Sequence, residues 1–439
     1  MRILFITQLF VPEMGALANR MYVFARDLAA AGNEVSVVTG MPNYPRGVVL
    51  EEYRGKMFSK EDRDGYTVLR SAYITVPRNK SRWPQLFSYL SFLPGALWNS
   101  LKAGKIDLVF VTSPPIFPAL VALLVAALRR AKLIFDVRDL WPDEIVVYGG
   151  AGEHSPGVRF LHMLERFIYQ RSDRISCTTD SIADAVCQRG GRREKILQLP
   201  NGADLDLFRP VSADNDVVRE FDLAGRFVVM YCGAFGIKHG LNSILEAAEL
   251  LQEEEGIRFL FVGAGGREGD LEECIRTMRL RNVIFVGERK LEELPLLLAR
   301  ADVCVSSHCP VAYADKIVAV KVFEYLACGK PVIGLHTGET ARVIQESGAG
   351  IVLKPADSHG LAEAIRALYR NPDLLSVLAS RSRAYVEKQF SRQAVALKLR
   401  ETAAGLLRRP APVPVGVVTE GNLAAVSDTA SMADKQRAA

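Results

Sequence analysis

The sequence lacks any arrangement of cysteines that would build a metal site or a disulfide framework. Its seven cysteines are scattered, with no Cys-x-x-Cys pair and no Cys/His pairs at zinc-binding spacing. Cysteines of this kind are typical of reduced thiols in a cytoplasm. The net charge of +5 is too small to indicate nucleic-acid binding by itself, and we expect no nucleic-acid partner.

Long apolar segments are also missing. The longest one, Ile116 to Leu128, has 13 residues and is shorter than the roughly 18–20 residues that a membrane-spanning helix needs. Because it follows a predicted strand and precedes Arg129 and Arg130, we expect a buried helix. The first residues, MRILFITQLFVPE, do not have the long apolar core and the cleavage site of a signal peptide.

Strands and helices alternate along most of the chain. With 439 residues, 49% apolar and 24% charged, the chain is long enough for two domains and has the composition of a globular protein. Alternating strands and helices favour parallel β-α-β winding, in which the loops after the strands share one edge of the sheet. Strands are predicted at residues 2–7, 35–39, 67–71, 108–112, 133–137, 174–178, 196–199, 227–232, 258–262, 283–286 and 303–306, and from Val332 onward.

The stretch from Ser306 to Gly338 contains the strongest candidate site. A strand ends there, a loop follows, and a short helix is predicted from about Val318 to Ala327. Lys321 and Glu324 are three residues apart and share one helical face. A lysine near a phosphate and a carboxylate that accepts from sugar hydroxyls would suit a nucleotide, together with the free amides at the helix start. The alternative is an intrahelical Lys–Glu pair on the surface.

The run KVFEYLACGKPVI, residues 321–333, resembles the donor-binding signature of glycosyltransferase family 4, a family of retaining enzymes with the GT-B fold. In that family, a glutamate at the position of Glu324 holds the donor ribose. The other glutamate of the pattern falls on Lys316 here. With a lysine just before the helix, the sequence resembles the subgroup of the family that builds bacterial surface polysaccharides (O-antigen, capsule, exopolysaccharide).

The resemblance covers nearly all of residues 1–405 and implies an α/β protein of the GT-B fold, with two facing doubly wound Rossmann-like domains and an interdomain cleft. Residues 1–210 would bind the acceptor, residues 211–390 would bind the nucleotide-sugar, and residues 391–407 would form a helix that crosses back to the first domain. The run PNGADLDLFRP, which ends at Pro210, is similar to the family's Asn-Gly-Val-Asp segment and is interpreted as a hinge. The tail 408–439 lacks periodic apolar spacing, and we expect it to be disordered.

The loop after the first strand, PEMGALANR, contains one glycine, Gly15, but no full G-x-G-x-x-G pattern. A lone glycine at such a junction is usually only a turn. The resemblance implies a donor-binding role, in which the backbone at Gly15 approaches a diphosphate without hindrance from a Cβ atom. Arg20, one turn into the helix, is a candidate for the same phosphates. The alternative for Arg20 is an exposed surface arginine.

The segment FDVRDLWPDE, residues 135–144, contains the catalytic candidates. Many members of the family have His-Asp at the end of this strand, with the histidine beside the transferred sugar. Here the pair is Arg138 and Asp139, with the arginine in the place of the histidine. Asp139 would orient the acceptor hydroxyl or offset charge that develops on the sugar. Asp143 and Glu144 are alternatives, and a purely structural Arg138–Asp139 pair is another.

Two loops of the second half are predicted to bind the donor. The run GAFGIKHGL resembles the family's loop that grips the donor diphosphate, and the amide of Gly236 and the charge of Lys238 would cradle a phosphate. The alternative is a plain glycine-rich turn with a surface lysine. In the run GERKLEEL, we expect Arg289 and Lys290 to flank the nucleotide base.

The segment from Trp83 to Leu101 is aromatic and nearly uncharged, with basic residues on both sides. Such a segment can lie in a membrane interface. We therefore expect residues around 83–105 to contact the inner membrane, and the protein to be peripheral on its cytoplasmic face. The alternative is a helix that packs on its own domain.

Asp-x-Asp motifs occur at residues 62–64, 204–206 and 214–216, but none follows a predicted buried strand. We expect no metal and no other cofactor, because lysines and helix N-termini would stabilise the leaving group. The resemblance implies a UDP-linked sugar as the donor and a polyprenyl-diphosphate-linked glycan as the acceptor. An N-acetylated deoxyhexosamine is the usual donor sugar of the subgroup.

The favoured interpretation is a retaining glycosyltransferase of the hexosyl or N-acetylhexosaminyl type. Since no carboxylate nucleophile is placed by the sequence, we expect same-face attack, with the donor phosphate taking the acceptor proton. Two alternatives stay open. A nucleotide-sugar 2-epimerase shares the fold but needs no acceptor, and a non-catalytic scaffold subunit would explain the replaced family residues.

Overall fold

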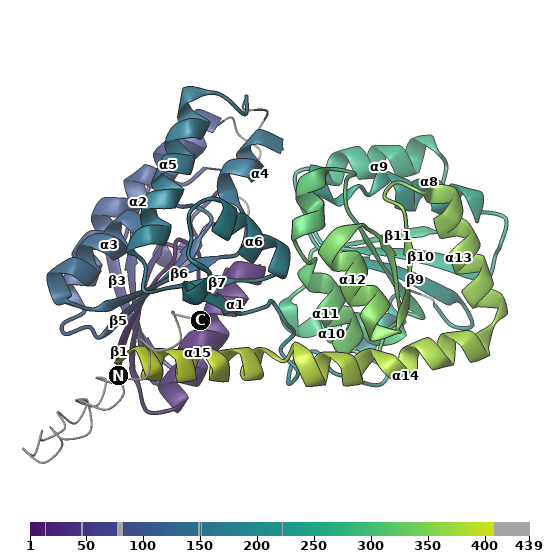
Figure 1. Cartoon of the computed structure of the whole chain (residues 1–439). Coiled ribbons are helices and arrows are strands. Elements are labelled where there is room, and N and C mark those ends of the chain that lie inside the picture. Colours follow the sequence, from purple (N-terminus) through teal and green to yellow (C-terminus); the bar gives the residue numbers. More distant parts are fainter. Residues whose placement is uncertain are drawn as a thin grey trace, which may run out of the picture. The chain divides into compact units, whose positions relative to one another are not determined.

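The computed structural model describes the chain except for residues 14, 45–46, 77–81, 148–149, 151, 222 and 408–439. Residues 1–406 form one compact unit, and residues 407–439 are a second unit. The predicted disorder of the tail therefore falls outside the described residues. The first unit contains two separate sheets, each with helices packed against it (Figure 1).

The first sheet has eight strands in the order β3-β4-β2-β1-β5-β6-β7-β8. Its pairs are parallel except β3 with β4, which is antiparallel. The strands are β1 Arg2–Ile6, β2 Glu34–Gly40, β3 Phe58–Arg63, β4 Tyr66–Ser71, β5 Leu108–Ser113, β6 Lys132–Val137, β7 Arg174–Cys177 and β8 Ile196–Gln198. The parallel strands were predictable because they are apolar runs buried on both faces, whereas β3, with the polar sequence FSKEDR, was missed.

The second sheet has six parallel strands in the order β11-β10-β9-β12-β13-β14. These are β9 Phe227–Cys232, β10 Ile257–Val262, β11 Val283–Gly287, β12 Val303–Ser307, β13 Val332–Leu335 and β14 Gly350–Leu353. The first five agree with the predicted strands to within a residue. The chain passes from one sheet to the other between Gln198 and Phe227, and the domain limits predicted at residues 210 and 390 stay predictions.

Helices cover the sheets and form most of the connections (Figure 1). They are α1 Ala16–Ala30, α2 Arg82–Lys102, α3 Pro118–Arg129, α4 Trp141–Val147, α5 Pro156–Arg171, α6 Asp180–Gln188, α7 Asp216–Arg219, α8 Asn242–Leu250, α9 Glu268–Thr277, α10 Leu294–Arg300, α11 Val320–Ala327, α12 Gly338–Ser347, α13 Ser358–Arg370, α14 Pro372–Gln389 and α15 Arg392–Leu407. The short 3-10 segments η3 Ile237–His239 and η5 Ala312–Lys316 matter for the site described below. Some helices begin at a residue whose side chain caps the first turn. At the start of α6, for example, the Thr179 hydroxyl accepts from the Ile182 amide.

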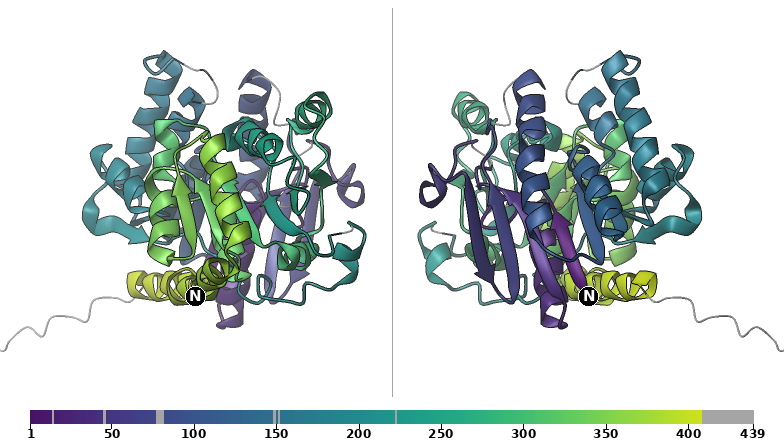
Figure 2. Two further views of the ribbon diagram at one scale, coloured as in Figure 1. Left: turned by 90° about the vertical axis from the view of Figure 1, so that its right-hand side faces the viewer. Right: turned by 90° about the vertical axis from the view of Figure 1, so that its left-hand side faces the viewer.

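The prediction of a buried helix at residues 116–128 is only partly correct. Helix α3 buries Val121, Ala122 and Val125 against the first sheet, but its leucines on the other face are exposed. In the right-hand view of Figure 2, the blue helices α2 and α3 lie in front of strands of the first sheet. In the part of the chain that the structure describes, no helix has the length and hydropathy to cross a bilayer.

Each sheet is buried between apolar clusters. The C-terminal helix α15 contributes Val395, Ala396 and Leu399 to the same cluster as Ile3 and Phe5 of β1, so it packs beside the first sheet. Helix α14, which precedes it, contacts α11 and α13 of the second sheet. Helices α14 and α15 therefore connect the two sheets. In folds of this kind, ligands bind at the loops after the parallel strands.

Candidate functional site

Glu324 and Lys321 lie on α11, directly after the loop that follows β12. The alternative of a surface Lys–Glu pair is wrong, because each side chain is partly buried and bonds to a residue outside the helix. Glu324 Oε1 accepts from Arg392 Nη2 at 3.3 Å, and the glutamate side chain is 19% exposed. Burial raises the pKa of Glu324, while Arg392 and Lys321 lower it. Glu324 is therefore a carboxylate with one fixed cationic partner.

Lys321 extends to the end of β9. Its Nζ atom donates to the Tyr231 hydroxyl at 2.5 Å and lies 3.9 Å from the centre of that ring. Burial lowers the pKa of Lys321 to about 7. Gly233 has a φ of 153°, and a Cβ atom there would be 2.7 Å from the lysine Nζ. A side chain at residue 233 would thus displace the ammonium group from the strand end.

Three histidines, which the sequence interpretation did not assign to the site, gather around the same strand ends. His239 follows β9, His308 follows β12 and His336 follows β13, with ring centres 6.0 Å and 6.3 Å apart in that order. His336 Nε2 is 2.8 Å from Ser306 Oγ. Burial lowers the pKa of His239 well below its usual value, that of His308 to about 4 and that of His336 to about 3. All three are therefore neutral near pH 7. In the sequence, the signal that could have assigned these histidines to the site was their position in the loops after predicted strands.

Asp139 and Arg138 follow β6 of the first sheet, as predicted. The two side chains are close enough for the structural ion pair that was the alternative, but the distance is long, with 4.0 Å between Arg138 Nη2 and Asp139 Oδ2. Arg138 Nε also donates to Thr112 Oγ1 at 3.3 Å. Asp139 Oδ1 accepts from the hydroxyl of Tyr313, which belongs to η5 after β12. The catalytic candidate of the first sheet therefore touches a loop of the second sheet.

The two alternative acids on α4 also have partners from the second sheet's loops. The Nη2 atom of Arg189 donates to both carboxylate oxygens of Asp143, at 2.7 and 2.8 Å. The same carboxylate lies 3.7 Å from the Nζ atom of Lys316. Glu144 lies 3.5 Å from the Nζ of Lys238. The residue at the position of the family's first glutamate, Lys316, therefore faces an aspartate of the first sheet.

Arg20 is not an exposed arginine, so that alternative is wrong. Its Nη atoms donate to the carbonyl oxygens of Leu199 and Pro200, both at 2.8 Å, and Nη2 is 3.3 Å from Asp136 Oδ1. The side chain is 4% exposed, because it is enclosed between α1, β6 and the turn after β8. Its terminal nitrogens thus connect α1 to β6 and to the turn after β8. A contact with donor phosphate stays a prediction.

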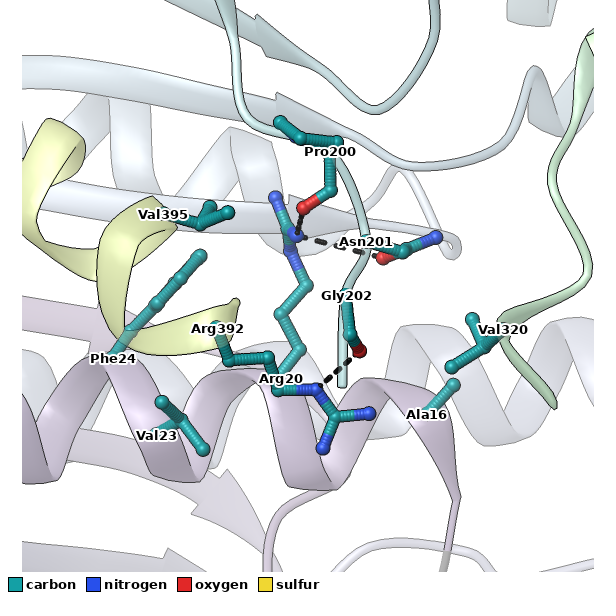
Figure 3. Close-up of a pocket in the computed structure, with 10 residues that line it drawn as sticks. All are labelled: Ala16, Arg20, Val23, Phe24, Pro200, Asn201, Gly202, Val320, Arg392 and Val395. Atoms are coloured by element: carbon teal, nitrogen blue, oxygen red, sulfur yellow. Dashed lines mark hydrogen bonds between the residues drawn. The ribbon is translucent and has the colours of Figure 1, made fainter. Parts of the chain in front are cut away.

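A small pocket lies where α1, the turn at 200–202, the first residue of α11 and the first turns of α15 meet. Figure 3 shows Ala16 and Val320 at the right, Arg20 and Arg392 further to the left, and Asn201 above and between them. Ala16 follows Gly15 and Val320 precedes Lys321 along the chain. The pocket therefore brings the start of α1 close to the start of α11.

The remaining predicted residues are spread over the same strand ends and beyond. Gly15 is the N-cap residue of α1, and its φ of 146° suits a glycine. Gly236 precedes η3, beside the ring of His239. Arg289 donates to Glu220 Oε1 at 2.5 Å and stacks over the Phe221 ring. Arg289 thus contacts the chain segment that connects the first sheet to the second. Its position beside a nucleotide base stays a prediction.

Among the described residues, no group of three or more His, Cys, Asp or Glu side chains is placed to hold a metal ion. The cations that are placed near Glu324 are Lys321 and Arg392, and Lys238 lies after β9. Chemically, this arrangement offers fixed positive charges, neutral histidines and a carboxylate that can accept from hydroxyls. The need for a cation stays a separate prediction.

Two family models match the chain. The model described as "Glycosyl transferase 4-like domain" matches residues 15–202, and "Glycosyl transferases group 1" matches residues 226–371. The first model contains Gly15, Arg20, Arg138 and Asp139, and the second contains Lys321 and Glu324. The matched ranges follow the two sheets.

Bacterial relatives have names from polysaccharide synthesis. A protein of Escherichia coli K12 named as a colanic acid biosynthesis glycosyl transferase, WcaI, is 27% identical over 396 residues, which are 88% of this chain and 95% of WcaI. A protein of Bacillus subtilis 168 named as a teichuronic acid biosynthesis glycosyltransferase, TuaH, is 30% identical over 48% of this chain and 52% of its own.

Solved structures share the fold over nearly the whole chain. Sucrose-phosphate synthase of Thermosynechococcus elongatus has a TM-score of 0.74 at 20% identity, covering 92% of this chain and 98% of its own. HepE of Anabaena, in complex with UDP-glucose, has a TM-score of 0.67 at 18% identity, covering 92% of this chain and 100% of its own. These structures establish the two-sheet α/β fold that the sequence predicted as GT-B.

Proposed function

Because the chain belongs to the GT-B glycosyltransferases of family 4 that act in bacterial surface polysaccharide biosynthesis, we propose that it transfers a sugar from a UDP-linked donor to a lipid-linked glycan with retention of configuration. The observation that carries the donor half of the proposal is the placement of Glu324 and Lys321 on α11. The carboxylate and the ammonium group lie at the carboxyl edge of the second sheet, where nucleotides bind in such folds. HepE, which shares the fold, was solved with UDP-glucose.

In the proposed complex, Glu324 accepts from the ribose hydroxyls and Lys321 faces the diphosphate. The amides at the start of α11 and the charge of Lys238 add to the positive field around the phosphates. Gly15 lets the start of α1 approach the same diphosphate. These fixed charges stabilise the negative charge that develops on the departing UDP, and we propose that no metal ion or other cofactor is required.

The proposed chemistry is attack from the face that the leaving group vacates. The bond between the sugar C1 and the phosphate oxygen breaks, the acceptor oxygen bonds to C1, and the acceptor proton passes to the departing phosphate oxygen. Asp139 orients the acceptor hydroxyl and offsets positive charge on the sugar, with Arg138 beside it. The Tyr313 hydroxyl, which donates to Asp139 Oδ1, would help to hold the carboxylate in place.

The acceptor half of the proposal places the first sheet at a membrane. A polyprenyl-diphosphate-linked glycan is embedded in the bilayer, so the enzyme must reach the membrane surface. The aromatic helix α2 within residues 83–105 suits that contact, since Trp83 and Phe87 are exposed. We therefore propose a peripheral position on the cytoplasmic face of the inner membrane. An N-acetylated deoxyhexosamine is the first donor sugar to examine, within the hexosyl and N-acetylhexosaminyl classes.

The proposal is tested by binding and by transfer. Purified protein is titrated calorimetrically with a panel of UDP-sugars, and those that bind are incubated with lipid extract of bacterial membranes. Glu324→Ala should weaken donor binding about 10- to 100-fold, because a hydrogen bond to a charged group contributes about 1.5–3 kcal/mol. The matched control is Glu249→Ala, which changes an exposed glutamate on α8.

Each outcome separates the alternatives. Transfer of label from the donor to lipid, with the α-anomeric form of an α-linked donor kept, supports a retaining transferase. An epimerised nucleotide-sugar formed without acceptor would indicate a 2-epimerase instead. Full donor binding in Glu324→Ala would remove the assignment of this residue, and a wild-type chain that binds no UDP-sugar would indicate a scaffold protein.

A further inference from the structure

Helices α2, α3 and α5 each present a stripe of apolar side chains to the outside. On α3, Leu120, Leu124 and Leu128 recur every four residues, and the last is 60% exposed. Such spacing places them on one face of the helix. The opposite face of α3 is buried, so the stripe is a second apolar surface on the same helix.

Helix α5 repeats the arrangement with larger side chains. Phe160, Met163 and Phe167 follow the same three- and four-residue spacing and are 52%, 62% and 45% exposed. The buried side of α5 carries Leu164 and Ile168 instead. On α2, Trp83, Phe87 and Trp98 are exposed. All nine of these exposed side chains are Leu, Phe, Trp or Met, and they are concentrated on three helices.

The three helices are neighbours. Helix α3 contacts both α2 and α5, so it lies between them. Arg129 Nη2 at the end of α3 donates to the Leu101 carbonyl oxygen of α2 at 2.7 Å, which ties these helix ends together. Figure 1 shows α5, α2 and α3 on the same flank of the first sheet. We call this surface the three-helix face.

The charges on the three-helix face have one sign. The exposed basic residues of α2, α3 and α5 are Lys102, Arg129, Arg159, Arg166 and Arg171. The single acidic residue in the three helices is Glu165, whose side chain is 3% exposed because it is bound by Tyr169 and Arg189. An apolar face with a basic rim and no exposed carboxylate complements a surface that is apolar below and negatively charged above.

Two basic side chains stand directly against the aromatic ones. Lys102 Nζ is 4.7 Å from the centre of the Trp98 ring, and the guanidinium of Arg171 is 5.4 Å from the centre of the Phe167 ring. In both pairs the cationic group lies over the face of an aromatic ring. Aromatic rings paired with cations in this way suit the boundary between lipid tails and headgroups.

We propose that the whole three-helix face, and not α2 alone, docks on a bilayer that contains anionic phospholipid. The proposal deepens the suggested membrane position of residues 83–105 by assigning α3 and α5 to the contact. The leucines of α3 and the α5 residues Phe160 and Met163 enter the headgroup boundary, while the five basic residues contact lipid phosphates. The binding needs neither donor nor acceptor.

A second copy of the chain is a weaker occupant for this face. Two such faces packed together would oppose five exposed basic residues to five others, with no exposed acidic residue on these helices to neutralise them. A bilayer with phosphatidylglycerol supplies the missing negative charge. The charge pattern is what distinguishes the two occupants.

The test is co-sedimentation of the purified full-length chain with vesicles of phosphatidylglycerol and phosphatidylethanolamine, and with vesicles of phosphatidylcholine. We expect binding to the anionic vesicles and at least about tenfold weaker binding to the neutral ones. Leu124→Glu and Met163→Glu should each weaken binding to anionic vesicles by about tenfold or more. Matched controls are Leu250→Glu on α8 and Val377→Glu on α14, which change similarly exposed apolar residues elsewhere and should bind as wild type does.

Several outcomes would overturn the proposal. These are absence of vesicle binding by the wild-type chain, equal losses in the control variants, and unchanged vesicle binding in both Leu124→Glu and Met163→Glu. Sedimentation equilibrium of the chain without lipid adds a further one: a dimer that Met163→Glu converts to a monomer would assign the face to a second copy.

The result is independent of the proposed reaction. UDP-sugar binding by Met163→Glu should equal that of wild type, which also shows that the variant is folded. A chain that transfers sugar but does not bind vesicles removes only the docking proposal. A chain that binds vesicles but transfers no sugar removes only the proposed function.

Discussion

The guanidinium of Arg392 joins two parts of the chain: its Nη2 atom lies 3.3 Å from Glu324 Oε1, and its Nε atom donates to the Gly202 carbonyl oxygen at 2.7 Å. One side chain therefore connects the proposed ribose-binding carboxylate to the turn that ends the first sheet. Arg392 is also part of the pocket shown in Figure 3. Its exposed fraction of 6% means that the interaction is shielded from solvent.

Changing Arg392 should alter the pH dependence of donor binding. Burial raises the pKa of Glu324 and Arg392 lowers it, so Arg392→Met should raise that pKa further. As the pH falls, the variant then loses its carboxylate sooner than the wild type does. Relative to the wild type at the same pH, the loss of UDP-sugar affinity in Arg392→Met should be about tenfold larger near pH 6 than near pH 8, with a smaller difference in Arg392→Lys. A loss of affinity that is equal at both pH values would indicate a purely structural role.

The ammonium group of Lys321 should make donor binding sensitive to pH on the alkaline side. Because burial lowers the pKa of Lys321 to about 7, its charged fraction falls as the pH rises above that value. A bound diphosphate favours the charged form, so binding takes up a proton. UDP-sugar affinity should therefore decrease by up to about tenfold per pH unit above about pH 7.

Two variants of Lys321 separate this effect from other titrations. Lys321→Met should bind weakly at all pH values, and Lys321→Arg should bind without the alkaline decrease, because arginine stays charged. Calorimetry in buffers of different ionisation enthalpy measures the proton uptake directly. Binding to the wild type that is constant between about pH 6 and about pH 8.5 would contradict the prediction.

Asp139 and its partner Tyr313 should differ in their effect on transfer. If Asp139 acts on the reacting groups, Asp139→Asn should lower kcat by about 100-fold or more while the thermal unfolding midpoint changes little. Tyr313→Phe removes one hydrogen bond, which contributes about 0.5–1.5 kcal/mol, and should lower kcat by less than about tenfold. Equal losses in the two variants would mean that Asp139 acts only through the contact with Tyr313.

Arg20 should matter chiefly for stability. Its partner Asp136 is fully buried, and Arg20→Met would leave that carboxylate with only the hydroxyls of Thr112 and Ser176. We expect the free energy of unfolding to fall by about 3–5 kcal/mol, measured by chemical denaturation. Arg26→Met, on the same helix but in a more exposed pair, should cost less than about 1 kcal/mol.

A double variant gives the control for that interpretation. Arg20→Met combined with Asp136→Asn removes the unpaired charge and should recover part of the lost stability. If Arg20→Met kept full stability but lost donor affinity, Arg20 would be a phosphate ligand and the structural interpretation would be wrong.

The sequence identified most of the strands because a parallel strand is a local signal. Parallel strands are short apolar runs; Asp139 follows β6 closely, and Lys321 and Glu324 lie on the helix after the loop that follows β12. Their partners could not be predicted in the same way. Tyr313 is 174 residues from Asp139, and Arg392 is 68 residues from Glu324, so only the folded chain shows these contacts.

Burial was the other property that the sequence left undetermined. Arg20 is a charged residue with no nearby acid in the sequence, yet the fold encloses it beside Asp136. The reverse holds for Leu124, an apolar residue in an apolar helix that is exposed because only one face of α3 meets the sheet. In both positions tertiary packing, not residue type, decides exposure.

Near Gly202, the segment that leaves the first sheet is bonded to the backbone at the start of α15. A methyl group at residue 202 would be 2.1 Å from the Phe390 carbonyl oxygen, and Ala203 exchanges backbone hydrogen bonds of 3.0 Å with Phe390 and Arg392. A side chain at residue 202 would therefore push this backbone apart, and a glycine there keeps the turn after the first sheet attached to the start of α15.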